Sequence, residues 1–213
     1  MVLATTKVKR RTQAERREEA ERRIVQSAIK LVSERGYDGF TLADVGEAAG
    51  YSRGLPAHYF GRKEDLLSLV AEHTVEGYRT AIANLPQTER GLPRLVSLIR
   101  KYTAPGDSQA TRSLSLLIAE SLVRPDLKKT IKKLNDRGLE TLEVELRLGI
   151  EAGNIRPDID VKAQASMIYS FLRGQMSFQV LDSKFDWRAV GEEFLATLQA
   201  RLSVSRKRAP TRA

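Results

Sequence analysis

The stretch that decides the fold runs from Gly36 to Leu67 and reads GYDGFTLADVGEAAGYSRGLPAHYFGRKEDLL. Its first half predicts a short helix from Thr41 to Gly50. Thr41 followed by Asp44 is a capping box, because the hydroxyl accepts a hydrogen bond from the Asp44 amide while the carboxylate reaches back. That carboxylate also lies at the positive end of the helix dipole. A tight turn is expected at Gly50, where this helix ends.

The second half predicts another short helix, from Ser52 as N-cap to Phe60. Pro56 removes at most one early hydrogen bond there, and none if the helix begins later than Ser52. Two short helices joined by a glycine-containing turn, after a longer helix, form the helix-turn-helix arrangement of a small DNA-binding module. The turn alone is a weak signal, which the basic N-terminus and the side chains of the second short helix strengthen.

Working outward, apolar residues recur at helical spacing through nearly the whole chain, and no alternating stretch predicts a strand. The first helix begins at Thr12, which forms a capping box with Glu15, and ends at Gly36. A fourth helix is expected from about Lys63. The remaining helices are expected at residues 92–103, 108–123, 126–152, 161–181 and 187–202, the last two capped by Asp160 and Asp186.

The fold class is therefore all-α, with about nine helices. An N-terminal three-helix helix-turn-helix domain with a basic arm is expected over residues 1–62. A second helical domain is expected over residues 63–202, and a basic disordered tail over residues 203–213. No repeat of fixed period is present, which disfavours a helical solenoid.

Composition excludes several classes of function. The chain has 213 residues, 41% of them hydrophobic and 30% charged, which is enough for a substantial core. It has no cysteine, which excludes disulfides, thiolate zinc sites and cysteine nucleophiles, and its two histidines lead us to expect no metal and no cofactor. No run of about 18 apolar residues would span a bilayer. We therefore expect a cytoplasmic protein with no membrane partner.

The formal net charge of +9 is concentrated at the two ends of the chain. Residues 1–63 carry 13 basic and 8 acidic residues, residues 64–200 carry 18 and 19, and residues 201–213 carry 5 and none. Double-stranded DNA is the partner that a basic N-terminal module on a nearly neutral body favours. The basic tail is treated as an accessory at most.

The segment from Gly36 to Leu67, within a match of about 55 residues from Thr12, resembles the N-terminal signature of the TetR family of one-component transcriptional regulators. The resemblance implies a homodimer that binds an inverted-repeat operator. It also implies that the C-terminal domain binds a small-molecule effector and alters the affinity for DNA. Repression is the usual mode of the family. This sequence departs from the family pattern at Ala57, where an aromatic residue is usual, and at Pro56.

The second short helix is the expected reading element, because the N-terminal end of such a helix enters the major groove. Arg53, Leu55 and Ala57 are expected to contact base edges or thymine methyl groups, and Arg53 can pair with guanine through two hydrogen bonds. Thr41, Ser52, Tyr59 and Lys63 are expected to contact phosphates, and His58 could contact either bases or phosphates. Arg10 and Arg11 are expected to belong to a flexible arm that reaches the adjacent minor groove or flanking phosphates. A core role remains open for Tyr59. The arginines at 16, 17, 22 and 23 alternate with glutamates, which favours a solvated helix face.

The last two helices carry more apolar surface than one monomer core needs. A four-helix homodimer interface is therefore the hypothesis, with the candidates Val161, Ile168, Leu172, Gly174, Trp187, Val190, Phe194 and Leu198. A larger monomer core is the alternative. Candidate effector contacts, which are open to the same core interpretation, are Tyr78, Tyr102, Met167, Phe171, Gln175 and Phe178.

Three functions compete at this point. A sequence-specific regulator, with repression relieved by an unidentified effector, fits both the reading helix and the C-terminal domain. An architectural protein that binds DNA without sequence preference would use the basic ends, but leaves a body of some 140 residues without a role. An enzyme is disfavoured, because the sequence has no glycine-rich phosphate loop and no metal-ligand cluster.

Overall fold

The computed structural model describes residues 12–84, 90–103, 109–182 and 184–204. Within those ranges the chain forms nine helices and no strand, which confirms the predicted all-α class. The helices are α1 (Gln13–Arg35), α2 (Leu42–Ala48), α3 (Leu55–Phe60), α4 (Lys63–Ala83), α5 (Leu92–Tyr102), α6 (Gln109–Glu120), α7 (Pro125–Glu151), α8 (Val161–Leu181) and α9 (Trp187–Leu202). None of these helices combines the length and the apolar character needed to cross a bilayer.

Helix starts are set by the side chains that the sequence indicates. Thr12 and Glu15 form the capping box of α1, and Thr41 and Asp44 form that of α2. The Thr41 amide donates to Asp44 Oδ2 at 2.7 Å, and the Asp44 amide donates to Thr41 Oγ1 at 3.3 Å. The Asp160 and Asp186 carboxylates cap α8 and α9. Each cap satisfies an amide that has no partner within its own helix.

The start of α3 differs from the expectation that Ser52 caps it. The Ser52 carbonyl accepts from the Leu55 amide at 3.1 Å, so residues 52–55 form a turn, and the helix begins only at Leu55. Gly54 is the N-cap and supplies no side-chain hydrogen bond. Pro56 consequently lies in the first turn, where a missing amide hydrogen costs no helical bond.

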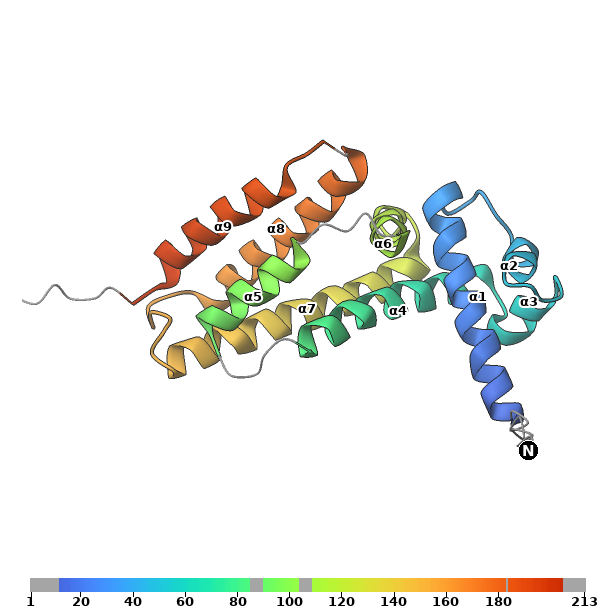
Figure 1. Cartoon of the computed structure of the whole chain (residues 1–213), viewed down its shortest axis with the longest axis horizontal. Coiled ribbons are helices and arrows are strands. Elements are labelled where there is room, and N and C mark those ends of the chain that lie inside the picture. Colours follow the sequence, from blue (N-terminus) through green and yellow to red (C-terminus); the bar gives the residue numbers. More distant parts are fainter. Residues whose placement is uncertain (1–11, 85–89, 104–108, 183, 205–213) are drawn as a thin grey trace, which may run out of the picture.

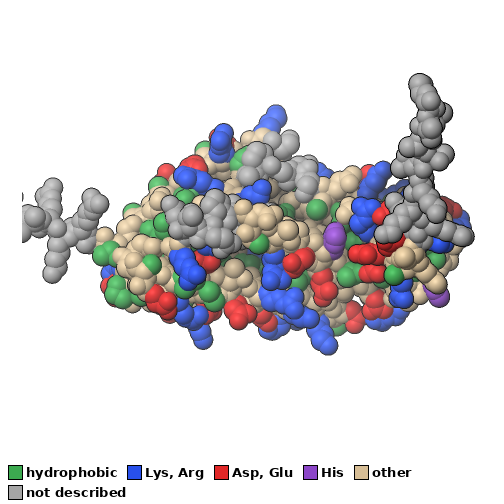
Figure 2. All heavy atoms as spheres, turned by 60° about the horizontal axis from the view of Figure 1, so that its bottom comes forward, with side chains coloured by type: hydrophobic (Ala, Val, Ile, Leu, Met, Phe, Trp, Pro, Cys, Tyr) green, Lys and Arg blue, Asp and Glu red, His purple; other side chains and the backbone are tan. Residues whose placement is uncertain are grey.

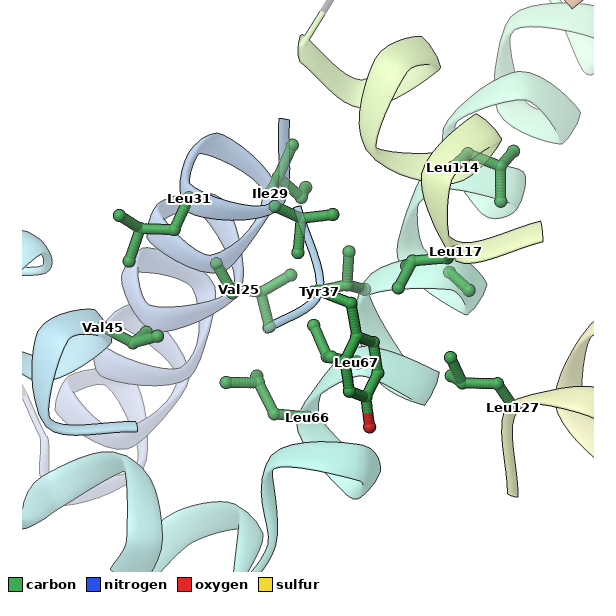
Figure 3. Close-up of a cluster of buried hydrophobic side chains, with 14 of the residues drawn as sticks. Val25, Ile29, Leu31, Tyr37, Val45, Leu66, Leu67, Leu114, Leu117 and Leu127 are labelled. Atoms are coloured by element: carbon green, nitrogen blue, oxygen red, sulfur yellow. The ribbon is translucent and has the colours of Figure 1, made fainter. Parts of the chain in front are cut away.

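The nine helices form an elongated molecule with α1–α3 at one end (Figure 1). Helices α5, α8 and α9 lie at the other end, and α4 and α7 run lengthwise between the two ends. One buried cluster joins α1–α4 to α6 and α7, and a second joins α5, α7, α8 and α9. In Figure 3 the side chains of Leu67 from α4, Leu117 from α6 and Leu127 from α7 converge beside Tyr37.

Helices α2 and α3 approach each other closely at Gly46. A Cβ atom added there would lie 2.6 Å from the Ser52 carbonyl oxygen and 3.2 Å from Pro56 Cδ. Gly46 is buried and lies in the interior of α2, where glycine is otherwise unfavourable. The absence of a side chain therefore allows the turn before α3 to pack directly on α2.

We expect Gly46→Ala to destabilise the protein by about 1–3 kcal/mol, because backbone atoms of the turn must move to admit the methyl group. Helix propensity alone gives the opposite sign, a gain of about 0.5–1 kcal/mol. Thermal or urea unfolding measures the difference. Gly54→Ala is the control, because a Cβ atom at Gly54 meets nothing within 4 Å. Unchanged or raised stability in Gly46→Ala would show that the close approach is not a constraint.

Candidate DNA-binding surface and ligand cavity

The residues assigned to DNA contact in and before α3 lie at the exposed end of the N-terminal module. Ser52, Arg53, Ala57 and His58 are exposed, and Leu55 is half-buried. Because α3 begins at Leu55, the Arg53 side chain projects from the turn before the helix rather than from its first turn. The side chains of Arg53, Ala57 and His58 are thus accessible to a duplex.

Arg53 is already held in place by a neighbour. Its Nη1 atom donates to Glu47 Oε1 at 2.8 Å, and both side chains are exposed. An exposed pair of this kind contributes about 0–1 kcal/mol and exchanges readily for another anion. The pair orients the guanidinium at the mouth of the turn and leaves it available for guanine or phosphate.

A groove runs between the N-terminal half of α1 and helix α3, with a volume of about 630 Å³. Its walls are Gln13, Arg16, Arg17, Ala20, Tyr51, Leu55, His58 and Tyr59. The Arg17 guanidinium lies 5.8 Å from the centre of the half-buried Tyr59 ring. The alternation of Arg16 and Arg17 with glutamates predicted a solvated helix face. The structure places both arginines beside His58 and Tyr59, which were assigned to DNA contacts.

Basic and acidic side chains both occur along the length of the face shown in Figure 2.

Lys63 was assigned to phosphate, but the structure gives its ammonium a partner inside the chain. The Lys63 Nζ atom donates to the Phe40 carbonyl oxygen and lies 4.2 Å from the Phe40 ring centre and 5.2 Å from that of Tyr37. Partial burial lowers the pKa of Lys63. These contacts tie the start of α4 to the loop between α1 and α2 and use one of the three donors of the ammonium.

The other predicted phosphate contacts are placed as follows. Thr41 is exposed, and its hydroxyl already donates to Asp44 Oδ2 at 2.8 Å. The hydrogen bonds from the Thr41 backbone and side chain lower the pKa of Asp44. Arg10 and Arg11, assigned to the flexible arm, lie outside the described residues.

The second candidate site is a cavity between α4, α5, α6, α7 and α8, with a volume of about 70 Å³. It is lined by Val75, Tyr78, Arg79, Leu98, Tyr102, Leu114, Leu134, Arg137, Gly138, Thr141, Leu142, Tyr169, Leu172, Arg173 and Met176. The Tyr78 and Tyr102 rings stack with their centres 5.3 Å apart. Burial raises the pKa of Tyr102 to about 12, so its phenol stays neutral at ordinary pH.

Of the predicted effector contacts, the structure brings only Tyr78 and Tyr102 to this cavity. Met167 and Phe178 are more than half exposed on α8, and Phe171 stacks on Phe194 at 3.7 Å. Gln175 is buried, and its Oε1 atom has no hydrogen-bond partner among the described residues.

Several polar residues besides the candidate effector contacts line the cavity. Tyr169 donates to Asn135 Oδ1 at 2.9 Å, and Arg173 hydrogen-bonds the same oxygen. Arg137 and Arg79 add two further guanidinium groups. Arg137 lies three residues after the buried Leu134, on the flank of the apolar stripe of α7. That spacing is the available signal, but it also fits an arginine that covers the edge of the core.

Polar contacts around Arg124, the residue before α7, also join the N-terminal module to the turn between α6 and α7. Its Nη2 atom donates to Asp38 Oδ2 at 2.9 Å, and its Nε atom donates to Glu120 Oε2 at 2.9 Å. Its guanidinium lies 3.7 Å from the centre of the Tyr37 ring, whose hydroxyl donates to Glu64. We call the contacts of Arg124 with Tyr37, Asp38 and Glu120 the Arg124 bridge. They connect the loop after α1 to the turn between α6 and α7.

The predicted dimer residues divide into two groups. Ile168, Leu172 and Leu198 are buried in the core of the chain itself, so they are not available to a partner copy as the chain stands. Val161, Gly174, Trp187 and Phe194 are half-buried, and Val190 is exposed. The large apolar side chains most exposed on these helices are Met167 at 60%, Phe178 at 53% and Leu181 at 81%.

An exposed reading helix packed on two supporting helices, beside a basic groove, defines a helix-turn-helix DNA-binding protein. Comparison with known proteins also indicates a DNA-binding regulator. Residues 24–70 match the family described as "Bacterial regulatory proteins, tetR family". The chain is 28% identical over 204 residues to the HTH-type transcriptional regulator CymR of Pseudomonas putida, covering 94% of this chain and 96% of that protein.

Solved structures agree with the fold. A TetR-family regulator from Rhodococcus sp. superposes with a TM-score of 0.78 at 16% identity, over 87% of this chain and 100% of the other. A regulator from Saccharomonospora viridis in complex with choline gives a TM-score of 0.76 at 21% identity, over 88% and 100%. The chain thus has a tetR-type DNA-binding domain at residues 24–70, and the relatives that it resembles are transcriptional regulators rather than enzymes.

We expect Lys63→Met to lower the melting temperature, because the Phe40 carbonyl loses its charged donor while the aliphatic stem is retained. The salt dependence of DNA binding should remain as in the wild type. A phosphate contact by Lys63 would instead reduce the slope of log affinity against log salt by about one. Unfolding curves and binding titrations at several salt concentrations distinguish the two roles.

Proposed function

We propose that this regulator is a repressor that binds an inverted-repeat operator as a homodimer and is released by a small-molecule effector. The carrying observation is that α4 belongs to both candidate sites. Its first half contributes Leu66 and Leu67 to the core beneath the DNA-binding module, and its second half contributes Val75 and Tyr78 to the cavity wall. We retain residues 1–62 as the DNA-binding unit and 63–202 as the effector and dimerisation unit. Such a regulator acts on DNA in the cytoplasm.

The exposed apolar residues of α8 and α9 support dimerisation. Four large apolar side chains on these helices are exposed to solvent in the monomer: Met167, Phe178 and Leu181 on α8, and Val190 on α9. Large apolar side chains exposed on neighbouring helices are expected at a protein interface. Two copies paired by a twofold axis would present two copies of α3, and the operator would share that symmetry.

Effector binding would act by population shift. A ligand that fits the cavity better in one arrangement of α4, α6 and α7 favours that arrangement and so alters the spacing of the two reading helices. The Arg124 bridge supports this route, because it joins the turn between α6 and α7 directly to the loop that precedes α2. The alternative, an architectural protein without sequence preference, offers no role for the cavity.

Selection of genomic fragments by the purified protein should recover sites that share an inverted repeat. On such a site we expect Arg53→Ala to lose about 1–3 kcal/mol of discrimination at one base pair of each half-site. Arg17→Ala, which changes a cation in the groove beside Tyr59, should weaken operator and random DNA alike. A retained pool with no shared motif, or equal losses on both DNAs for Arg53→Ala, would contradict the proposal.

We expect Arg124→Leu to bind the operator but to lose most of its response to effector, because the Arg124 bridge is broken. Allosteric coupling is usually about 1–3 kcal/mol, so a response of roughly 5- to 150-fold is at stake. The readout is operator affinity with and without inducing ligand. Arg147→Leu is the control, because Arg147 pairs with Glu143 on its own helix, α7, and with no other acidic residue in the described part of the chain. A full response in Arg124→Leu would assign the coupling to the core contacts alone.

A further inference from the structure

We propose that the cavity between α4 and α8 takes a small organic anion, a carboxylate carried on a compact apolar body. This inference rests on the proposed function, in which the cavity is the effector site. It concerns the charge and size of the ligand, which neither the family nor the fold determines. The argument rests on the charged groups of the wall, their partners and the available volume.

The charged groups that line the cavity all have the same sign. Arg79, Arg137 and Arg173 contribute guanidinium groups, and no aspartate or glutamate is among the lining residues. Glu76 pairs with Arg79 and balances its charge, and Asp136 pairs with Lys132, so the unbalanced charge of the wall comes from Arg137 and Arg173. The cavity therefore has an excess of positive charge that a bound anion would balance.

Two of these guanidinium groups lack a carboxylate partner among the described residues. Arg173, which is half-buried, hydrogen-bonds the neutral Asn135 side chain and lies 5.1 Å from the centre of the Tyr169 ring. Arg137 forms no ion pair within the described ranges. A guanidinium beside an apolar wall gains most from a carboxylate, whose two oxygens match its planar donors.

The rest of the wall favours an apolar body of limited size. Leu142, Leu172 and Met176 supply aliphatic surface, and the stacked rings of Tyr78 and Tyr102 supply an aromatic one. The volume of about 70 Å³ is less than half of the roughly 150 Å³ that holds a benzene molecule in an engineered protein cavity. A single ring or a short chain is therefore the largest body that modest side-chain movement would admit.

A quaternary ammonium ligand is the clearest competitor, because aromatic rings also bind cations. The choline complex of the Saccharomonospora regulator shows that a protein of this fold can bind one. In this chain the tyrosines of the cavity share its wall with three arginines. The guanidinium groups of Arg137 and Arg173, which have no carboxylate partner among the described residues, oppose a bound cation, so choline should bind poorly here.

The test is isothermal titration calorimetry of the full chain with four probes. Benzoate and butyrate carry the carboxylate on an aromatic and on a short aliphatic body. Benzamide is the neutral match of the first, and choline is the cation. We expect at least one carboxylate to bind, the amide to bind about tenfold more weakly or worse than the benzoate, and choline not to bind at millimolar concentration.

Variants locate the binding. Arg137→Gln and Arg173→Gln should each weaken carboxylate binding about tenfold, whereas Lys133→Gln, one turn from Arg137 on α7 but outside the cavity wall, should not. Arg173→Lys keeps the charge and should retain part of the affinity. Because Arg173 also hydrogen-bonds Asn135, unfolding curves check each variant, and the exposed Arg137 keeps the test valid if Arg173→Gln fails to fold.

The anion inference is overturned if neither carboxylate binds, if the amide binds as well as the benzoate, or if choline binds and the glutamine variants leave its affinity unchanged. A separate measurement of operator release keeps this outcome distinct from failure of the proposed function. Carboxylates that bind at Arg137 and Arg173 without releasing the operator would support the anion site and contradict effector relief. Release of the operator by a cation or a neutral ligand would support effector relief and contradict the anion site.

Discussion

The structure depends on one continuous apolar core that crosses the boundary between the DNA-binding module and the rest of the chain. Leu66 and Leu67 of α4 pack in the same buried cluster as Val45 of α2 and Leu117 of α6. Leu114 belongs to this cluster and also to the cavity wall. The wall of the candidate effector site is therefore the far edge of the core that supports the reading helix. A change in cavity packing has to be accommodated within that core.

The free energies of apolar burial and of exposed ion pairs show which contacts hold the DNA-binding module in place. Full burial of one leucine or valine side chain contributes about 1.5–3 kcal/mol, whereas an exposed ion pair contributes about 0–1 kcal/mol. The shared core therefore contributes most of the stability of the module. The Arg124 bridge contributes less stability but links specific residues, because its hydrogen bonds join Arg124 to Asp38 and Glu120. This division explains why removal of the bridge should affect coupling more than stability.

Local signals in the sequence predicted most of the fold. Capping boxes at Thr12 and Thr41 and the carboxylates at Asp160 and Asp186 identified helix starts, because a cap depends on residues three positions apart. Ser52 misled for the same reason: it is a good capping residue, but the close packing at Gly46 turns the chain there and delays the helix to Leu55.

The sites were harder to predict, because their partners lie far apart in the sequence. Lys63 reaches Phe40 over 23 residues, and only the folded chain shows that its ammonium has a carbonyl partner. Arg137 and Arg173 meet at a cavity formed by several helices, and periodicity on one helix cannot reveal that they share it. The arm residues Arg10 and Arg11 and the tail beyond Val204 stay predictions from charge alone.

The measurement that tests the shared core most directly is urea unfolding followed by two local probes on the full chain. Hydrogen exchange of α2 and α3 amides reports on the DNA-binding module, and hydrogen exchange of α6 and α7 amides reports on the helices that share its core. A core that crosses the boundary requires both sets of amides to lose protection at the same midpoint, in one cooperative transition. Loss of protection in α2 and α3 at clearly lower urea, with α6 and α7 still protected, would contradict a single shared core.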